Sequence, residues 1–102
     1  MERILLTDIQ DRTLAMAEDE FVYFKVARPV LGTFYERNVS FAELSGIVGR
    51  LSNLGLVHWR IRTGRCWYFR SHAAESLQHS CAAAFTATPR GVAYLRKLRH
   101  VA

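Results

Sequence analysis

Four arginines in the second half of the chain carry the clearest chemical signal in the sequence. They are Arg60, Arg62, Arg65 and Arg70. They lie within eleven residues, surround the turn 63–65 and alternate with aromatic residues such as Trp59, Trp67 and Tyr68. Guanidinium groups bind phosphate oxygens in pairs, so such a cluster can hold a nucleic-acid backbone or enter a minor groove. The alternative is a hairpin whose arginines are solvated and whose aromatic residues form core.

Charge is distributed unevenly along the 102 residues, whose net charge is +5. Residues 1–55 hold six Lys or Arg and eight Asp or Glu, whereas residues 56–102 hold eight Lys or Arg and one acid, Glu75. Twelve of the fourteen basic residues are arginine. The basic character therefore belongs to the second half, and together with the arginine cluster it favours a nucleic-acid partner.

The arginines are positioned by a predicted β-hairpin over residues 56–70. Residues 56–62 alternate bulky apolar and polar side chains, Gly64 supplies a turn, and residues 66–70 form the return strand. A helix is predicted immediately before this hairpin. Ser40 can cap its N-terminus, apolar residues recur at three- and four-residue steps up to Leu54, and Gly55 suits a left-handed residue after its end.

Two further helices are predicted before residue 40. Thr7 can cap the first, from Asp8 to about Glu18. Its inward stripe would be Ile9, Thr13, Met16 and Ala17. Residues 21–24 are compatible with a strand or with helix. The second helix should begin near Pro29 and run to about Arg37, followed by a turn over 38–40.

The C-terminal third is less regular. Residues 71–79 have helix propensity, and residues 81–87 are compatible with a helix end or a strand. Thr88 can cap a last helix that starts at Pro89, with Val92, Leu95 and Leu98 on one side.

Two segments, 38–62 and 85–98, resemble parts of winged helix-turn-helix proteins, including small bacterial regulators of the MarR and PadR groups. In the turn, Asn38 stands where these proteins have a residue that tolerates a left-handed conformation, followed by the apolar Val39 and the cap Ser40. The resemblance implies an α+β, mainly helical fold in one domain over 1–102. Its parts would be a helix-turn-helix over about 29–54, a wing hairpin over about 56–70 and a C-terminal helix over about 89–99.

In such proteins the third helix enters the major groove and the wing contacts the backbone. The expected outward positions of this helix include Phe41, Ala42, Gly46 and Gly49, which are poor base readers. The expected DNA-binding residues are Ser40, Glu43, Ser45, Arg50, Arg60, Arg62, Arg65 and Arg70. We therefore expect the wing arginines to supply most of the affinity and Ser45, Arg50 and Glu43 to supply what base reading exists.

The leading hypothesis is a small transcriptional regulator that binds double-stranded DNA as a homodimer, with its first and last helices at the interface. The alternative is a winged-helix protein-interaction module, an adaptor or inhibitor that does not read DNA. Its partner would dock on the apolar, glycine-containing face Phe41, Ala42, Gly46 and Gly49.

Other classes find little support in the sequence. No glycine-rich phosphate loop or nucleophile motif is present, so we expect no enzyme and no cofactor. His72, Glu75 and His79 share a helical face near Cys66 and Cys81, but without close ligand pairs, so no metal site is expected. The cysteines are compatible with free thiols or one bridge. No run of about eighteen apolar residues occurs, which predicts a cytoplasmic protein without a membrane span.

Overall fold

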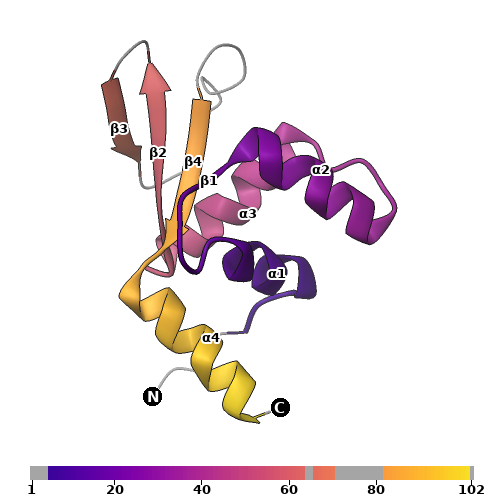
Figure 1. The fold of residues 1–102 in the computed structure, drawn as a ribbon, viewed down its shortest axis with the longest axis vertical. Coiled ribbons are helices and arrows are strands. Elements are labelled where there is room, and N and C mark those ends of the chain that lie inside the picture. Colours follow the sequence, from indigo (N-terminus) through magenta and orange to yellow (C-terminus); the bar gives the residue numbers. More distant parts are fainter. Residues whose placement is uncertain (1–4, 64–65, 71–81, 102) are drawn as a thin grey trace.

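The computed structural model describes residues 5–63, 66–70 and 82–101. These residues form an α+β fold, mostly helical, in which four helices accompany an antiparallel sheet (Figure 1). In chain order the elements are α1 (Asp8–Met16), β1 (Val22–Tyr23), α2 (Phe24–Tyr35), α3 (Phe41–Asn53), β2 (Val57–Thr63), β3 (Cys66–Arg70), β4 (Ala82–Ala87) and α4 (Pro89–Val101).

The sheet has the strand order β1-β4-β2-β3, and every neighbouring pair is antiparallel. The hairpin predicted over 56–70 is confirmed, with Thr63 opposite Cys66 at its turn end. Of the ambiguous segment 81–87, residues 82–87 are the strand β4, and residue 81 lies outside the described residues. β4 lies between β1 and β2. β2 is therefore an inner strand, bordered by β4 on one side and β3 on the other.

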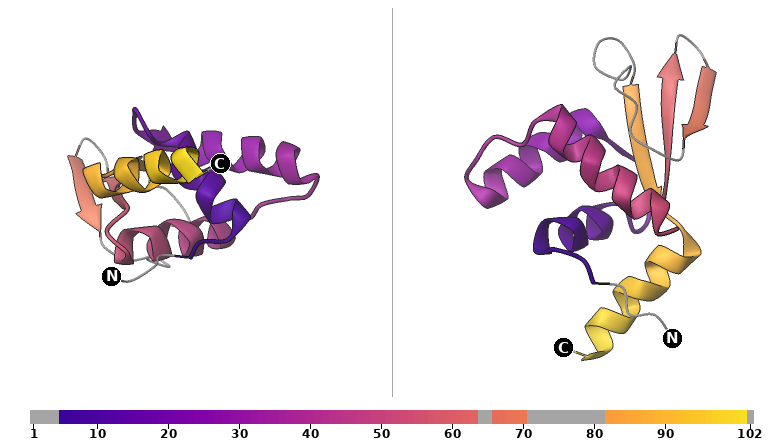
Figure 2. Two further views of the ribbon diagram at one scale, coloured as in Figure 1. Left: turned by 90° about the horizontal axis from the view of Figure 1, so that it is seen from below. Right: turned by 180° about the vertical axis from the view of Figure 1, so that it is seen from behind.

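An aromatic cluster centred on Phe24 joins the helices to the sheet. The Phe24 ring lies 5.9 Å from Trp59 in a stacked arrangement, 5.8 Å from Phe85 edge-on and 5.3 Å from Phe41. Phe24, Trp59 and Phe85 are buried, while Phe41 is partly buried against the core. α1, α2 and α3 gather beside the sheet around this cluster, as the views from the front and behind show (Figures 1 and 2).

The start of α2 differs from the sequence expectation. The helix begins at Phe24, five residues before Pro29, so the predicted helix start near Pro29 and the boundary at 29 are wrong. Pro29 lies inside the helix, where it removes one backbone hydrogen bond and crowds the carbonyl four residues earlier. Burial of Phe24 and Ala27 against the core offsets this cost. β1 is correspondingly confined to two residues of the predicted segment 21–24.

The capping predictions for α1 and α3 are confirmed. Thr7 and Gln10 form a complete capping box at the start of α1. Ser40 accepts a hydrogen bond from the backbone N–H of Glu43 at the start of α3. After α3, Gly55 has φ +76° and the N–H of Leu56 donates to Leu51, a left-handed helix ending. α1 itself ends at Met16, two residues before the predicted end.

α4 continues directly from β4 and passes the end of α1, as Figure 2 shows. The Thr88 hydroxyl donates to the Gly55 carbonyl at 2.7 Å and accepts from the N–H of Gly91 at 3.0 Å, so it caps α4 as predicted. The Tyr94 hydroxyl donates to Asp11 of α1 at 2.9 Å. Among the described helices, none combines the length and hydropathy that a membrane crossing requires.

The hydrogen bond between Tyr94 and Asp11 predicts how the stability of the protein changes at alkaline pH. Burial and this hydrogen bond raise the pKa of Tyr94 to about 12. An unfolded tyrosine has a pKa of about 10, so the unfolded state loses its proton first. The stability that this group contributes is complete below pH 10 and is lost as pH rises towards about 12. Urea unfolding should show that the free energy of unfolding falls less between pH 10 and 12 for Tyr94→Phe than for the wild type. Equal losses would contradict the contact.

Candidate nucleic-acid interface

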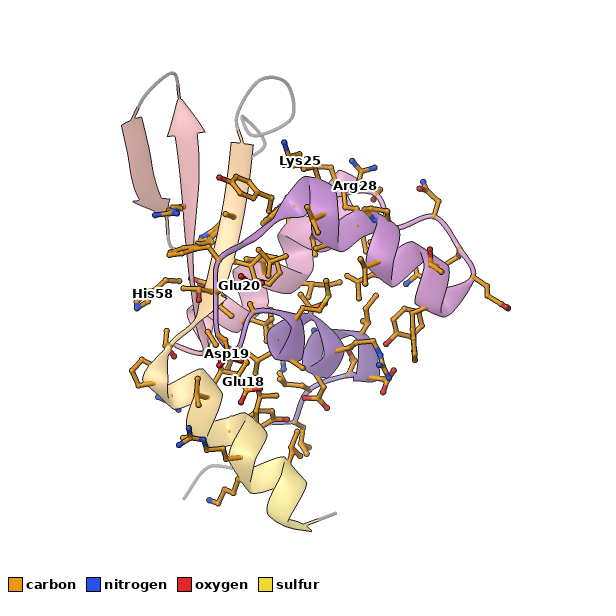
Figure 3. All side chains as sticks on the ribbon, in the orientation of Figure 1. Glu18, Asp19, Glu20, Lys25, Arg28 and His58 are labelled. Carbon is orange, nitrogen blue, oxygen red and sulfur yellow. The ribbon has the colours of Figure 1, made fainter. Side chains whose placement is uncertain are left out.

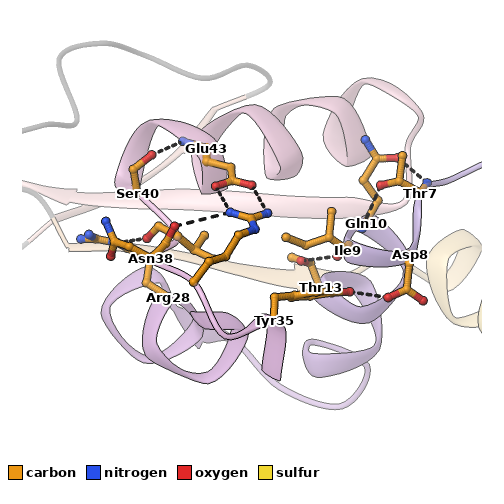
Figure 4. Close-up of polar contacts among 12 residues, drawn as sticks. Thr7, Asp8, Ile9, Gln10, Thr13, Arg28, Tyr35, Asn38, Ser40 and Glu43 are labelled. Atoms are coloured by element: carbon orange, nitrogen blue, oxygen red, sulfur yellow. Dashed lines mark hydrogen bonds and ion pairs between the residues drawn. The ribbon is translucent and has the colours of Figure 1, made fainter. Parts of the chain in front are cut away.

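The turn between α2 and α3 is fixed by backbone contacts. Glu36 ends α2 in the left-handed region with φ 54°, so the left-handed residue is Glu36 and not Asn38 as expected. Val39 is buried as the predicted apolar plug, and Arg28 Nε donates to its carbonyl at 3.0 Å (Figure 4). Arg28 therefore ties the middle of α2 to the start of α3, which sets how the N-terminus of α3 projects.

An ion pair covers the first turn of α3. Arg37 donates from both terminal nitrogens to the two carboxylate oxygens of Glu43, at 2.7 and 2.6 Å (Figure 4). This hydrogen bonding holds the pKa of Glu43 below its ordinary value and raises that of Arg37. Ser40 and Glu43 have the spacing of a capping box, but the Glu43 carboxylate binds Arg37. Both charges are therefore engaged with each other, and sequence reasoning missed the pair because it joins two elements.

Breaking this ion pair tests whether the start of α3 faces DNA. In Glu43→Gln the acid that repels phosphate is neutral and Arg37 is released, so DNA affinity should rise roughly 3-fold at low salt and the salt dependence should steepen by about one phosphate contact. Fluorescence anisotropy with a labelled duplex measures both. Glu36→Gln removes the same charge without releasing an arginine and is the matched control. Unchanged or weaker binding by Glu43→Gln would place this turn away from DNA.

Fewer residues of α3 face solvent than the sequence predicts. Ser45 and Gly49 are buried, so the expectation that both face outward is wrong, and Phe41 packs partly into the core. The reason is that α3 packs against three elements, α1, α2 and β2. At 100° per residue, the buried positions of α3 between residues 44 and 51 span about 200° of the helix circumference. The Ser45 hydroxyl has no hydrogen-bond partner among the described residues. A buried Ser45 is not placed to read a base.

The exposed residues of α3 form one strip along the helix. They are Ala42, Gly46, Arg50 and Asn53. Their spacing of three or four residues places them on a single line, and Arg50 is its one cation. The Arg50 guanidinium also donates to the Leu5 carbonyl at 3.3 Å. Among the predicted DNA-binding residues of this helix, Arg50 is exposed, Ser40 is the N-cap, and Glu43 is paired with Arg37.

The arginines of the hairpin fall on two faces of the sheet. Arg60 and Arg62 are two residues apart on β2 and share one face, whereas Arg70 is in register with the buried Trp59 and belongs to the other. The Arg60 guanidinium lies 3.7 Å from the centre of the Phe21 ring. Arg65 lies outside the described residues, and only the backbone of Arg62 and Arg70 is described. The strand register therefore separates Arg60 and Arg62 from Arg70, three members of the predicted four-arginine cluster.

The remaining charges are segregated in space. Lys25 and Arg28 lie in the first half of α2, at the end of the molecule toward which β2 runs, while Glu18 and Asp19 lie near α4 (Figure 3). A polyanion approaching the end of β2 would therefore come closer to the exposed Lys25 than to Glu18 and Asp19.

The residues weighed for metal binding, His72, Glu75, His79 and Cys81, lie outside the described residues, and of Cys66 only the backbone is described. Within the described parts of the chain, no three His, Cys, Asp or Glu side chains gather in an arrangement that could hold a metal ion.

Comparison with family models, with curated proteins and with solved structures finds no match for this chain, so the site is interpreted from its own geometry.

Proposed function

We propose that this chain is a winged helix-turn-helix protein that binds double-stranded DNA and acts as a small transcriptional regulator. The observation that carries the proposal is the hairpin β2–β3, which directly follows α3; Arg62 lies near the end of β2, and in the sequence Gly64 and Arg65 join its two strands. The short connection from α2 to α3, tied by Arg28, supports the helix-turn-helix part. The order of a short strand, two helices and a hairpin supports the winged part.

The hairpin, not α3, supplies most of the affinity in this proposal. The exposed strip of α3 offers Ala42 and Gly46, whose side chains carry no donors, and its two polar residues, Arg50 and Asn53, lie only in the last turn. Contacts through arginines at a hairpin turn are made to phosphates, which carry no direct sequence information. We therefore propose binding that is strongly salt dependent and weakly selective for sequence, with α3 approaching closely through its small residues.

The proposal is tested by replacing Arg62 and Arg65 together with alanine. Loss of two phosphate contacts should weaken binding of a labelled duplex by roughly 10-fold or more at low salt. The matched control is Arg96→Ala with Lys97→Ala, which removes two exposed charges from α4. Equal losses in both double variants would indicate a nonspecific effect of net charge, and absence of wild-type binding at low salt would refute DNA binding.

The alternative function, a protein-interaction module, is less favoured because the face predicted to bind its partner is mostly not exposed. Of Phe41, Ala42, Gly46 and Gly49, only Ala42 and Gly46 are exposed, because Phe41 packs towards Phe24 and Gly49 is buried. Two small side chains offer little apolar area to a partner.

A further inference from the structure

The solvent-facing side of α2 is apolar along most of its length. Val26, Val30 and Phe34 are each about half exposed, between 49 and 53 %. Pro29 and Thr33 are exposed on the same side, because these residues repeat at three- and four-residue steps. Between residues 26 and 34 the one charged side chain is Arg28, which is partly buried and bonded to Val39. The opposite side of α2 already packs against the core, so this second, solvent-facing apolar side is suited to binding another protein surface.

The residues of this face are arranged symmetrically about Val30. Val26 lies four residues before it and Phe34 four residues after it. Lys25 and Glu36, which carry opposite charges, are exposed at the two ends, five residues before and six after. At a rise of 1.5 Å per residue they lie roughly 7.5 Å and 9 Å from Val30 along the axis. A face with a midpoint and opposite charges at its ends is complementary to an antiparallel copy of itself.

We propose that two copies of this chain associate through an antiparallel pair of α2 helices. Val30 meets Val30 of the partner subunit at the two-fold axis, and Val26 packs against Phe34 of the partner subunit. Lys25 then faces Glu36 of the partner subunit at both ends of the interface. Arg12 covers one face of the Phe34 ring, with its guanidinium 3.4 Å from the ring centre, and the Tyr35 ring lies edge-on to it at 5.0 Å. The exposed half of the Phe34 ring is available for the contact.

The pairing is expected to be weak. A helix of twelve residues is about 18 Å long, so the two helices bury less than the roughly 1,600 Å² of a standard interface. Dissociation constants on the order of 10 μM are therefore expected for contacts at the low end of interface size. The interface differs from one made by the first and last helices, and it does not depend on DNA binding.

Sedimentation equilibrium without DNA, from low to several hundred micromolar protein, tests the pairing. The wild type should shift from one chain mass towards two, and Val30→Arg should weaken the dimer more than roughly 10-fold because two cations meet at the axis. Ala93→Arg adds the same charge to an exposed position of α4 and is the control. A wild type that remains a single chain, or a dimer lost in Ala93→Arg but kept in Val30→Arg, would overturn the proposal.

A charge exchange tests the antiparallel arrangement. Lys25→Glu places two acids opposite each other at each end and should weaken association roughly 3- to 10-fold. Adding Glu36→Lys restores opposite charges and should restore the wild-type dissociation constant. Both sites are exposed, and circular dichroism of each variant checks that the fold is kept. A double variant as weak as Lys25→Glu alone would overturn the antiparallel pairing.

Discussion

Gly91→Ala is expected to lower the free energy of unfolding by about 3 kcal/mol or more, because it forces an atom into an occupied position. A Cβ at Gly91 would lie 2.1 Å from the Leu56 carbonyl oxygen and 3.2 Å from a methyl group of Leu14. The same carbonyl accepts a hydrogen bond from the N–H of Thr88 at 2.9 Å, so it cannot move without breaking that contact. The first turn of α4 is thereby held against the segment that joins α3 to β2.

Gly46→Ala is the matched control for this substitution. Gly46 is exposed inside α3, and a Cβ there meets nothing within 4 Å. Alanine should therefore stabilise the protein by about 0.5–1 kcal/mol through helix propensity. Urea unfolding of both variants measures the contrast. Changes of the same sign would contradict the close approach of Gly91 to Leu56.

Phe24→Ala should lower the free energy of unfolding by about 3–5 kcal/mol, the range for truncating a buried aromatic residue. Phe24 contacts the rings of Trp59, Phe85 and Phe41, so its loss leaves a cavity where α2, α3 and the sheet meet. The surrounding rings come from three elements, α3, β2 and β4, and cannot all move inwards together.

Phe34→Ala removes the same ring from the same helix at an exposed site. Its expected cost in dilute solution is about 1 kcal/mol, because only about half of the Phe34 ring is buried. Thermal and urea unfolding of the two variants, compared with the wild type, check the difference. A cost for Phe34→Ala equal to that for Phe24→Ala would contradict the position of Phe24 at the centre of the core.

Local signals predicted much of the fold. The caps Thr7, Ser40 and Thr88 and the ending at Gly55 act within a few residues, and the structure confirms each of them. The hairpin followed from strand alternation and a glycine turn for the same reason. α4 extends to Val101, two residues beyond the expected end near 99, a difference within ordinary helix fraying.

Features that depend on distant contacts could not be predicted. α2 begins at Phe24 because that ring packs against Trp59 and Phe85, more than thirty residues away, and this packing overrides the preference of Pro29 for a helix start. Ser45 is buried because neighbouring elements cover a wider arc of α3 than one apolar stripe requires. The apolar face of α2 could not be predicted either, because Val26 lies before the expected start of that helix near Pro29.

The central claim is that the hairpin turn, through Arg62 and Arg65, provides the contacts to DNA. The most direct test is the salt dependence of duplex binding, measured by anisotropy for the wild type and for the double variant Arg62→Ala, Arg65→Ala. The slope of log K against log salt concentration should be shallower by about two in the variant, because two phosphate contacts are lost. Equal slopes for the two proteins would contradict the claim.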